Sequence, residues 1–98
     1  MRFDSGSTDI PTAGSRVQIS NTKDRVLWIR FHAVAANGGL VFFGVSDVSS
    51  THGRKLAANE KDEIDFRIGN EPGSVTFDTF YVDAAANGYD IDWEVILA

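Results

Sequence analysis

The sequence contains no cysteine, so the chain can form neither a disulfide nor a thiolate metal site. No apolar run approaches the roughly 20 residues that cross a bilayer as a helix. The N-terminal segment, Met1 to Thr8, lacks the apolar stretch of a secretory signal peptide. The sequence therefore predicts a protein that is used without export and has no membrane partner.

Positive charge is also scarce. The 98 residues include 9 Lys and Arg against 14 Asp and Glu, which gives a net charge of −5. Nucleic-acid-binding domains normally carry a basic patch, so we expect no nucleic-acid partner. The hydrophobic fraction of 43% suits one folded core in a chain of this length.

Catalytic motifs are missing as well. The sequence has no Gly-x-Ser-x-Gly, no His-Glu-x-x-His and no P-loop. His32 and His52 are the two histidines, and neither has further ligands at a metal-site spacing. Serines near His52 are ordinary loop residues. We expect no enzymatic activity, no cofactor and no metal.

Two Asn-Gly dipeptides dominate the pattern that is present. Asn37-Gly38 and Asn87-Gly88 each separate two apolar runs, and this arrangement is the strongest local signal for a β-hairpin. Helical periodicity is absent. The chain is predicted to be all-β, a single-domain antiparallel β-sandwich or jelly-roll-like barrel of seven to eight short strands. The expected strands are 16–19, 26–35, 40–45, 55–57, 64–68, 75–83 and 89–97, with a turn at 69–73.

The N-terminal residues 1–14 are rich in Ser, Thr, Gly and Asp and include Pro11. This composition predicts a flexible arm that precedes a β-sandwich domain over residues 15–98. A frayed terminus is one interpretation, and an arm that becomes ordered on a partner is the other. The candidate partner contacts in the arm are Arg2, Phe3 and Ile10.

A hairpin at Asn87-Gly88 would place an acidic face opposite an apolar core face. The expected core residues are Phe80, Val82, Ala84, Ile91, Trp93, Val95 and Leu97. In that register Asp83 lies directly across from Asp92, and like charges in this position destabilise a sheet. A solvated acidic face, a calcium site and contact with a basic partner surface are the three interpretations. The segment lacks EF-hand spacing, so no metal is predicted. The acidic face consists of Asp83, Asp90, Asp92 and Glu94.

In a hairpin at Asn37-Gly38, the expected core face consists of Leu27, Ile29, Phe31, Ala33, Phe42 and Gly44. The face opposite to it is also apolar. That face is too apolar to lie in water, so either the N-terminal segment covers it or it is a subunit interface. Interfaces favour Trp, Phe and Arg, and we adopt a homo-oligomer interface as the hypothesis. Its residues are Trp28, Arg30, His32, Val41 and Phe43.

Residues 42–53, Phe-Phe-Gly-Val-Ser-Asp-Val-Ser-Ser-Thr-His-Gly, resemble a pattern common in small virion proteins of tailed bacteriophages. The ending, with Phe80 to Asp83, Asn87-Gly88 and Asp92-Trp93, is similar to the same group. In size and character the chain, over roughly residues 16–98, looks like a capsid decoration (cement) protein.

This resemblance implies a structural protein without catalysis. Such proteins bind the major capsid protein on the outside of the head and stabilise it, often as homotrimers. The chain would then lie on the capsid surface of a virion assembled in the bacterial host cytoplasm.

Two alternatives remain at this stage. One is a tail or head-fibre component, which would share the fold and the lack of catalysis. The other is a carbohydrate-binding or adhesin module, in which Trp28 and Tyr81 would stack on sugar rings.

Overall fold

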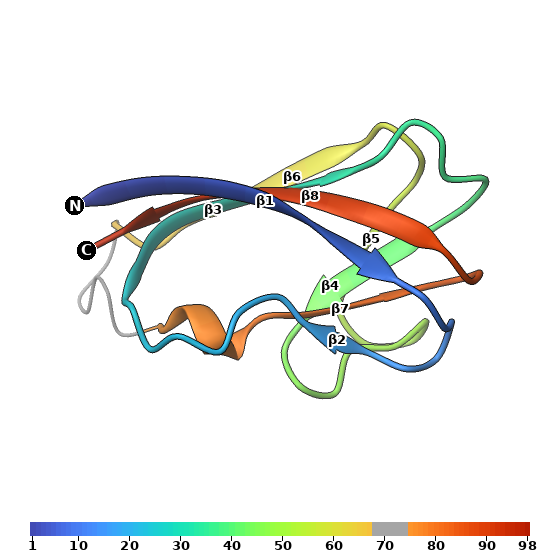
Figure 1. Cartoon of the computed structure of the whole chain (residues 1–98), viewed down its shortest axis with the longest axis horizontal. Helices are drawn as coiled ribbons and strands as arrows, with labels where there is room; N and C mark the ends of the chain where they lie inside the picture. The colour runs from blue at the N-terminus through green and yellow to red at the C-terminus, as the bar shows by residue number, and fades with distance from the viewer. Residues whose placement is uncertain (68–74) are drawn as a thin grey trace.

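The computed structural model describes residues 1–67 and 75–98, and these form a β-sandwich of two antiparallel four-stranded sheets (Figure 1). The predicted all-β class is confirmed. The first sheet has the order β1 (Arg2–Ile10), β8 (Tyr89–Leu97), β3 (Val26–Ala33), β6 (Lys61–Asp65). The second has the order β2 (Val17–Gln18), β7 (Tyr81–Ala84), β4 (Val41–Gly44), β5 (Arg54–Leu56), and a short 3-10 helix, η1 (Phe77–Thr79), precedes β7. The predicted turn at 69–73 lies outside the described residues.

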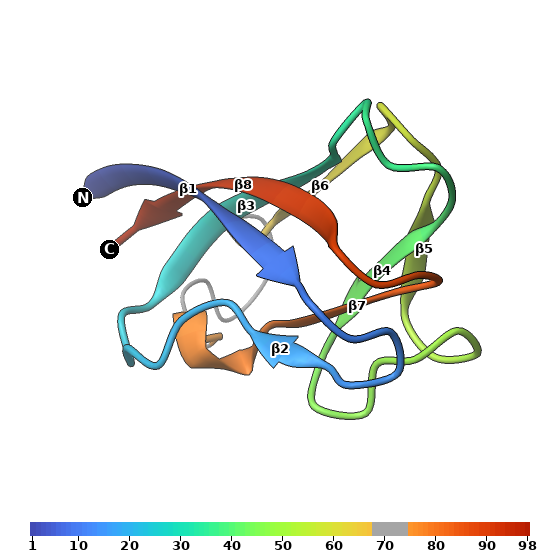
Figure 2. The same cartoon turned by 45° about the vertical axis from the view of Figure 1, so that its right-hand side comes forward.

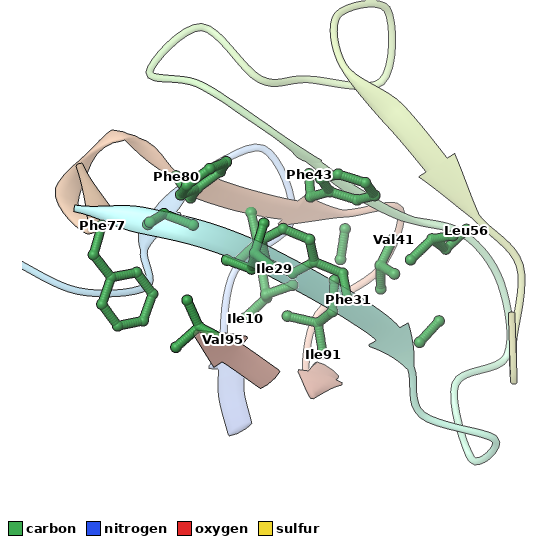
Figure 3. Packing of buried hydrophobic residues seen from close by; sticks show 14 of the residues in the cluster. Ile10, Ile29, Phe31, Val41, Phe43, Leu56, Phe77, Phe80, Ile91 and Val95 are labelled. Atoms are coloured by element: carbon green, nitrogen blue, oxygen red, sulfur yellow. The ribbon is translucent and has the colours of Figure 1, made fainter. Parts of the chain in front are cut away.

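The core lies between the two sheets, because alternate residues of each strand point inward. On β3, Ile29, Phe31 and Ala33 are fully buried. The ring of Phe31 stacks on that of Phe43 in β4, with centroids 4.3 Å apart (Figure 3). This contact joins the first sheet to the second. Ile91 and Val95 of β8 complete the inner face beside β3.

The N-terminal segment is a strand, and the prediction of a flexible arm over 1–14 is wrong. β1 pairs with β8 along its whole length, from Arg2 opposite Leu97 to Ile10 opposite Tyr89. The polar composition suits an edge strand that has one face in water. Ile10 is buried in the core, so it is not available as a partner contact.

A glycine in β1 makes room for a tryptophan of β8. Gly6 lies opposite Trp93, and a Cβ atom at Gly6 would come within 2.5 Å of the indole Cζ2. The indole Nε1 donates to Thr8 Oγ1 (3.2 Å), and its ring meets Phe77 edge-on. Trp93 therefore closes the core at the β1 edge. This agrees with its predicted place on the core face.

The two Asn-Gly dipeptides join the sheets instead of closing hairpins. β3 and β4 lie in different sheets, and so do β7 and β8 (Figure 2). A type I′ turn needs positive φ at both central residues, and of these four residues only Gly88 has it (80°). Both hairpin predictions are therefore wrong, as is the expected Asp83–Asp92 opposition, because Asp83 lies opposite Phe42.

The crossing to the second sheet changes which residues of β4 face the core. Phe42, expected in the core, lies on the outer face beside Asp83 and is buried there. Val41 and Phe43, predicted to lie at a subunit interface, point into the core, and Phe43 is 1% exposed. They are not available for self-association. β3 also contains a β-bulge between Val26 and Trp28, which leaves Leu27 half-buried where a core position was expected.

Candidate functional site: the open face of the first sheet

The outer faces of the two sheets differ in how they are covered. On the second sheet, loops 11–16 and 45–53 cover Phe42 and Asp83, so that both are buried. Asp83 Oδ1 accepts the Gly14 N–H (2.9 Å), and the Arg16 guanidinium donates to the Ser46 carbonyl oxygen and links the two loops. The first sheet has no such cover among the described residues (Figures 1 and 2). We call its outer surface the open face.

An apolar row crosses the open face. Phe3, Ile96 and Trp28 lie side by side on β1, β8 and β3. Phe3 is 61% exposed, whereas Ile96 and Trp28 are half-buried. Trp28 is held from two sides, since its Nε1 donates to Glu63 Oε2 (3.0 Å) and the Arg30 guanidinium carbon lies 5.8 Å from its ring centroid.

Two charged rows lie beside the apolar row. In the first, Arg30 Nε donates to Glu94 Oε1 (2.8 Å). In the second, His32 Nδ1 lies 3.9 Å from Asp92 Oδ2, and its Nε2 lies 3.0 Å from Asn59 Oδ1. The side chains of these two rows, with Lys61 and the small residues of β1 but without Asn59, line a shallow depression of about 550 Å³.

Carboxylates outnumber cations on the open face. A further row places Asp9 directly opposite Asp90. Burial raises the pKa of Asp90, and the facing Asp9 carboxyl raises it further. Hydrogen bonds from Arg67 hold the pKa of Asp65 below its usual range. With ionised carboxyl groups, the described residues of the face carry six negative charges against three positive ones. These are Asp9, Glu63, Asp65, Asp90, Asp92 and Glu94 against Arg30, Lys61 and Arg67.

The structure brings together part of each predicted set of site residues. Trp28, Arg30 and His32 lie on the open face, and Asp90, Asp92 and Glu94 lie beside them. The residues placed elsewhere are Val41, Phe43 and Ile10 in the core and Asp83 under the loops of the second sheet.

Arg2 and Phe3 are exposed, on β1. The sequence does not predict Lys61 as a site residue, because residues 59–62 have the charged composition of a turn. In the structure β6 begins at Lys61.

The geometry also bears on the alternative chemistries. Trp28 and Tyr81 belong to different sheets, so they do not form one platform for stacking on sugars. Within residues 1–67 and 75–98, no three His, Asp or Glu side chains are grouped so that they could hold a metal ion. The same residues include no helix long and apolar enough to cross a membrane.

Comparison with known proteins identifies no family for this chain. No family model matches the chain, and no curated protein matches it. Among solved structures, a chain from the disulfide-linked pili of Bacillus endospore appendages is similar at 14% identity and a TM-score of 0.45, over 99% of this chain and 88% of that chain.

Proposed function

We propose that this protein is a structural, non-enzymatic binding domain that docks through its open face on the outside of a phage capsid, as a decoration protein. The observation that carries the proposal is the difference in cover between the two sheets. The protein buries apolar residues under loops on one outer face and leaves an apolar row uncovered on the other. Protein interfaces commonly combine apolar anchor residues with a polar and charged periphery, and here the charged rows lie along one side of the apolar row.

Trp28 is the best candidate for the anchor of this interface. Tryptophan is enriched among the residues that dominate binding energy. The hydrogen bond to Glu63 and the Arg30 guanidinium fix the indole before binding, so little side-chain entropy is lost when a partner covers it.

The charges on the open face favour a basic partner surface. An excess of three negative charges would steer the domain toward lysine- and arginine-rich patches of the major capsid protein. A homotrimer, as the resemblance implies, stays a prediction. Val41 and Phe43 cannot contribute to it, since they lie in the core.

Co-sedimentation with empty heads, assembled from the major capsid protein of the same genome, tests the proposal. We expect the wild-type chain to sediment with the heads and Trp28→Ala to bind about ten-fold or more weakly. Tyr81→Ala is the matched control, because Tyr81 is also a half-buried aromatic residue but lies on the second sheet. Added salt should weaken binding, since charge steers it.

Two results would contradict the proposal. The first is a folded Trp28→Ala variant that binds heads as tightly as the wild type. The second is a wild-type chain that does not bind heads at all. Binding to purified tails in place of heads would support the tail-component alternative.

A further inference from the structure

The four strands at the edges of the sheets are not equally protected. Natural proteins keep edge strands short or charged, because unpaired backbone groups invite another strand. β2 has two residues, β5 has three with Arg54 and Lys55, and four of the five residues of β6 are charged. β1 is nine residues long, has neither lysine nor proline, and is uncharged from Ser5 to Thr8.

The free edge of β1 is most accessible in its first half. Residues 2–5 are exposed on both faces of the sheet, whereas burial increases toward Ile10. The Ser5 N–H donates to Asp4 Oδ1 (2.9 Å), so this group points away from β8. Every second residue of a strand directs its backbone groups to the same side. Phe3 therefore offers its own N–H and C=O to the free edge.

The sequence around Phe3 is complementary to itself. Arg2 and Asp4 flank Phe3 with opposite charges. If two copies of β1 pair antiparallel about Phe3, each Arg2 lies opposite the Asp4 of the other copy, and the two Phe3 rings lie side by side. Opposite charges and aromatic pairs in these positions stabilise a sheet. Arg2 already contacts Asp24 (3.0 Å), but a guanidinium has five donors and can serve both carboxylates.

We propose that two copies of this chain associate by antiparallel pairing of β1 with β1, centred on Phe3, and join their first sheets into one continuous sheet. The apolar row of Phe3, Ile96 and Trp28 then continues from one copy into the other. The two-fold axis is perpendicular to the sheet, so both open faces lie on the same side. This association uses the edge of the sheet and does not rest on binding to a capsid.

Single cysteine substitutions test the register, because the chain has no cysteine of its own. A residue on the two-fold axis lies opposite itself at a Cα separation of about 5.5 Å, which suits a disulfide. Phe3→Cys should therefore form a disulfide-linked dimer under mild oxidation. The controls are Ser5→Cys and Ser7→Cys, whose equivalent residues would be more than about 13 Å apart along the strands. Equal cross-linking at all three positions, or none at position 3, would overturn the proposal.

Charge reversal provides a second measurement, by sedimentation equilibrium over a range of concentrations. Arg2→Asp or Asp4→Arg alone places like charges opposite each other and should raise the dimer dissociation constant about ten-fold. The double variant restores opposite charges and should recover dimerisation. A wild-type chain that is monomeric at millimolar concentration, or a double variant no better than the singles, would refute the pairing.

Discussion

At the residue scale, Asp9 and Asp90 place two carboxyl groups opposite each other on the open face, which is unfavourable when both are ionised. They lie in register at the end of the β1–β8 ladder, where β3 has already ended. Burial and the nearby Asp9 raise the pKa of Asp90, so the folded protein holds this proton more tightly than the unfolded chain does. The stabilising contribution of Asp90 is therefore complete below the ordinary carboxyl pKa and is lost as the pH rises through the raised value.

Replacing Asp9 with Asn should stabilise the protein at neutral pH. The like-charge repulsion disappears, and we expect the melting temperature at pH 7 to rise by about 1–4 °C. The gain should vanish near pH 3, where Asp90 is protonated in both proteins. Asp47→Asn, in an exposed loop, is the control and should change little. A gain of the same size at both pH values would show that the carboxyl pair is not its cause.

At the scale of the structural elements, the asparagine side chains of the two Asn-Gly segments form hydrogen bonds with the backbone of other segments. Asn37 is 7% exposed, and its amide Nδ2 donates to the Asp90 carbonyl oxygen (2.8 Å) while its Oδ1 accepts the Asp90 N–H (3.1 Å). Asn37 thus pairs with the backbone of β8 as a strand residue would. Asn87 makes a single such bond, accepting the Ala13 N–H at an exposed position (2.8 Å).

This difference predicts unequal effects of two similar substitutions. Asn37→Ala leaves the Asp90 N–H without its partner and the Asp90 carbonyl oxygen with the longer bond from the Val34 N–H (3.5 Å). We expect a loss of about 1–3 kcal/mol in the free energy of unfolding. Asn87→Ala should lose about 0.5–1 kcal/mol, because water can replace the exposed bond. Urea unfolding of both variants measures the difference. Equal losses would mean that the Asn37 bonds add nothing to the fold.

The turns also show how far the sequence could predict the fold. Apolar alternation correctly predicted that Ile29, Phe31 and Ala33 face the core, because the period of two is a local property. The partner of each strand is not local. An Asn-Gly dipeptide has the same sequence whether it closes a hairpin or crosses between sheets, and that choice decided the burial of Val41 and Phe43. The sequence does not predict β1 for a related reason. Its residues are mostly polar, and their strand conformation depends on pairing with β8, at the far end of the chain.

At the scale of the whole molecule, the two ends of the chain have unequal structural importance. β8 lies between β1 and β3 and pairs with both, whereas β1 is an edge strand with one neighbour. Ile91, Val95 and Leu97 of β8 are buried in the core. Loss of β8 would therefore divide the first sheet, and loss of β1 would only expose one side of it.

Two truncations of similar length should consequently differ. Deletion of residues 89–98 should abolish the cooperative thermal transition, as followed by circular dichroism. Deletion of residues 1–9 should retain a cooperative transition at a lower temperature, because Ile10 and the β8–β3 ladder remain. A cooperative transition after loss of residues 89–98 would show that the β3–β6 pair and the second sheet fold without β8.

The central place of β8 has a consequence during translation. Of the eight strands, β8 is the last to emerge from the ribosome, yet β1 and β3 pair with it. β1, which is made first, must remain unpaired until nearly the whole domain has been synthesised, and domains dominated by such long-range pairing fold slowly. A ribosome that stops before residue 89 therefore releases a fragment without a complete first sheet. Such a fragment exposes its apolar segments, which makes it prone to aggregation and a substrate for chaperones.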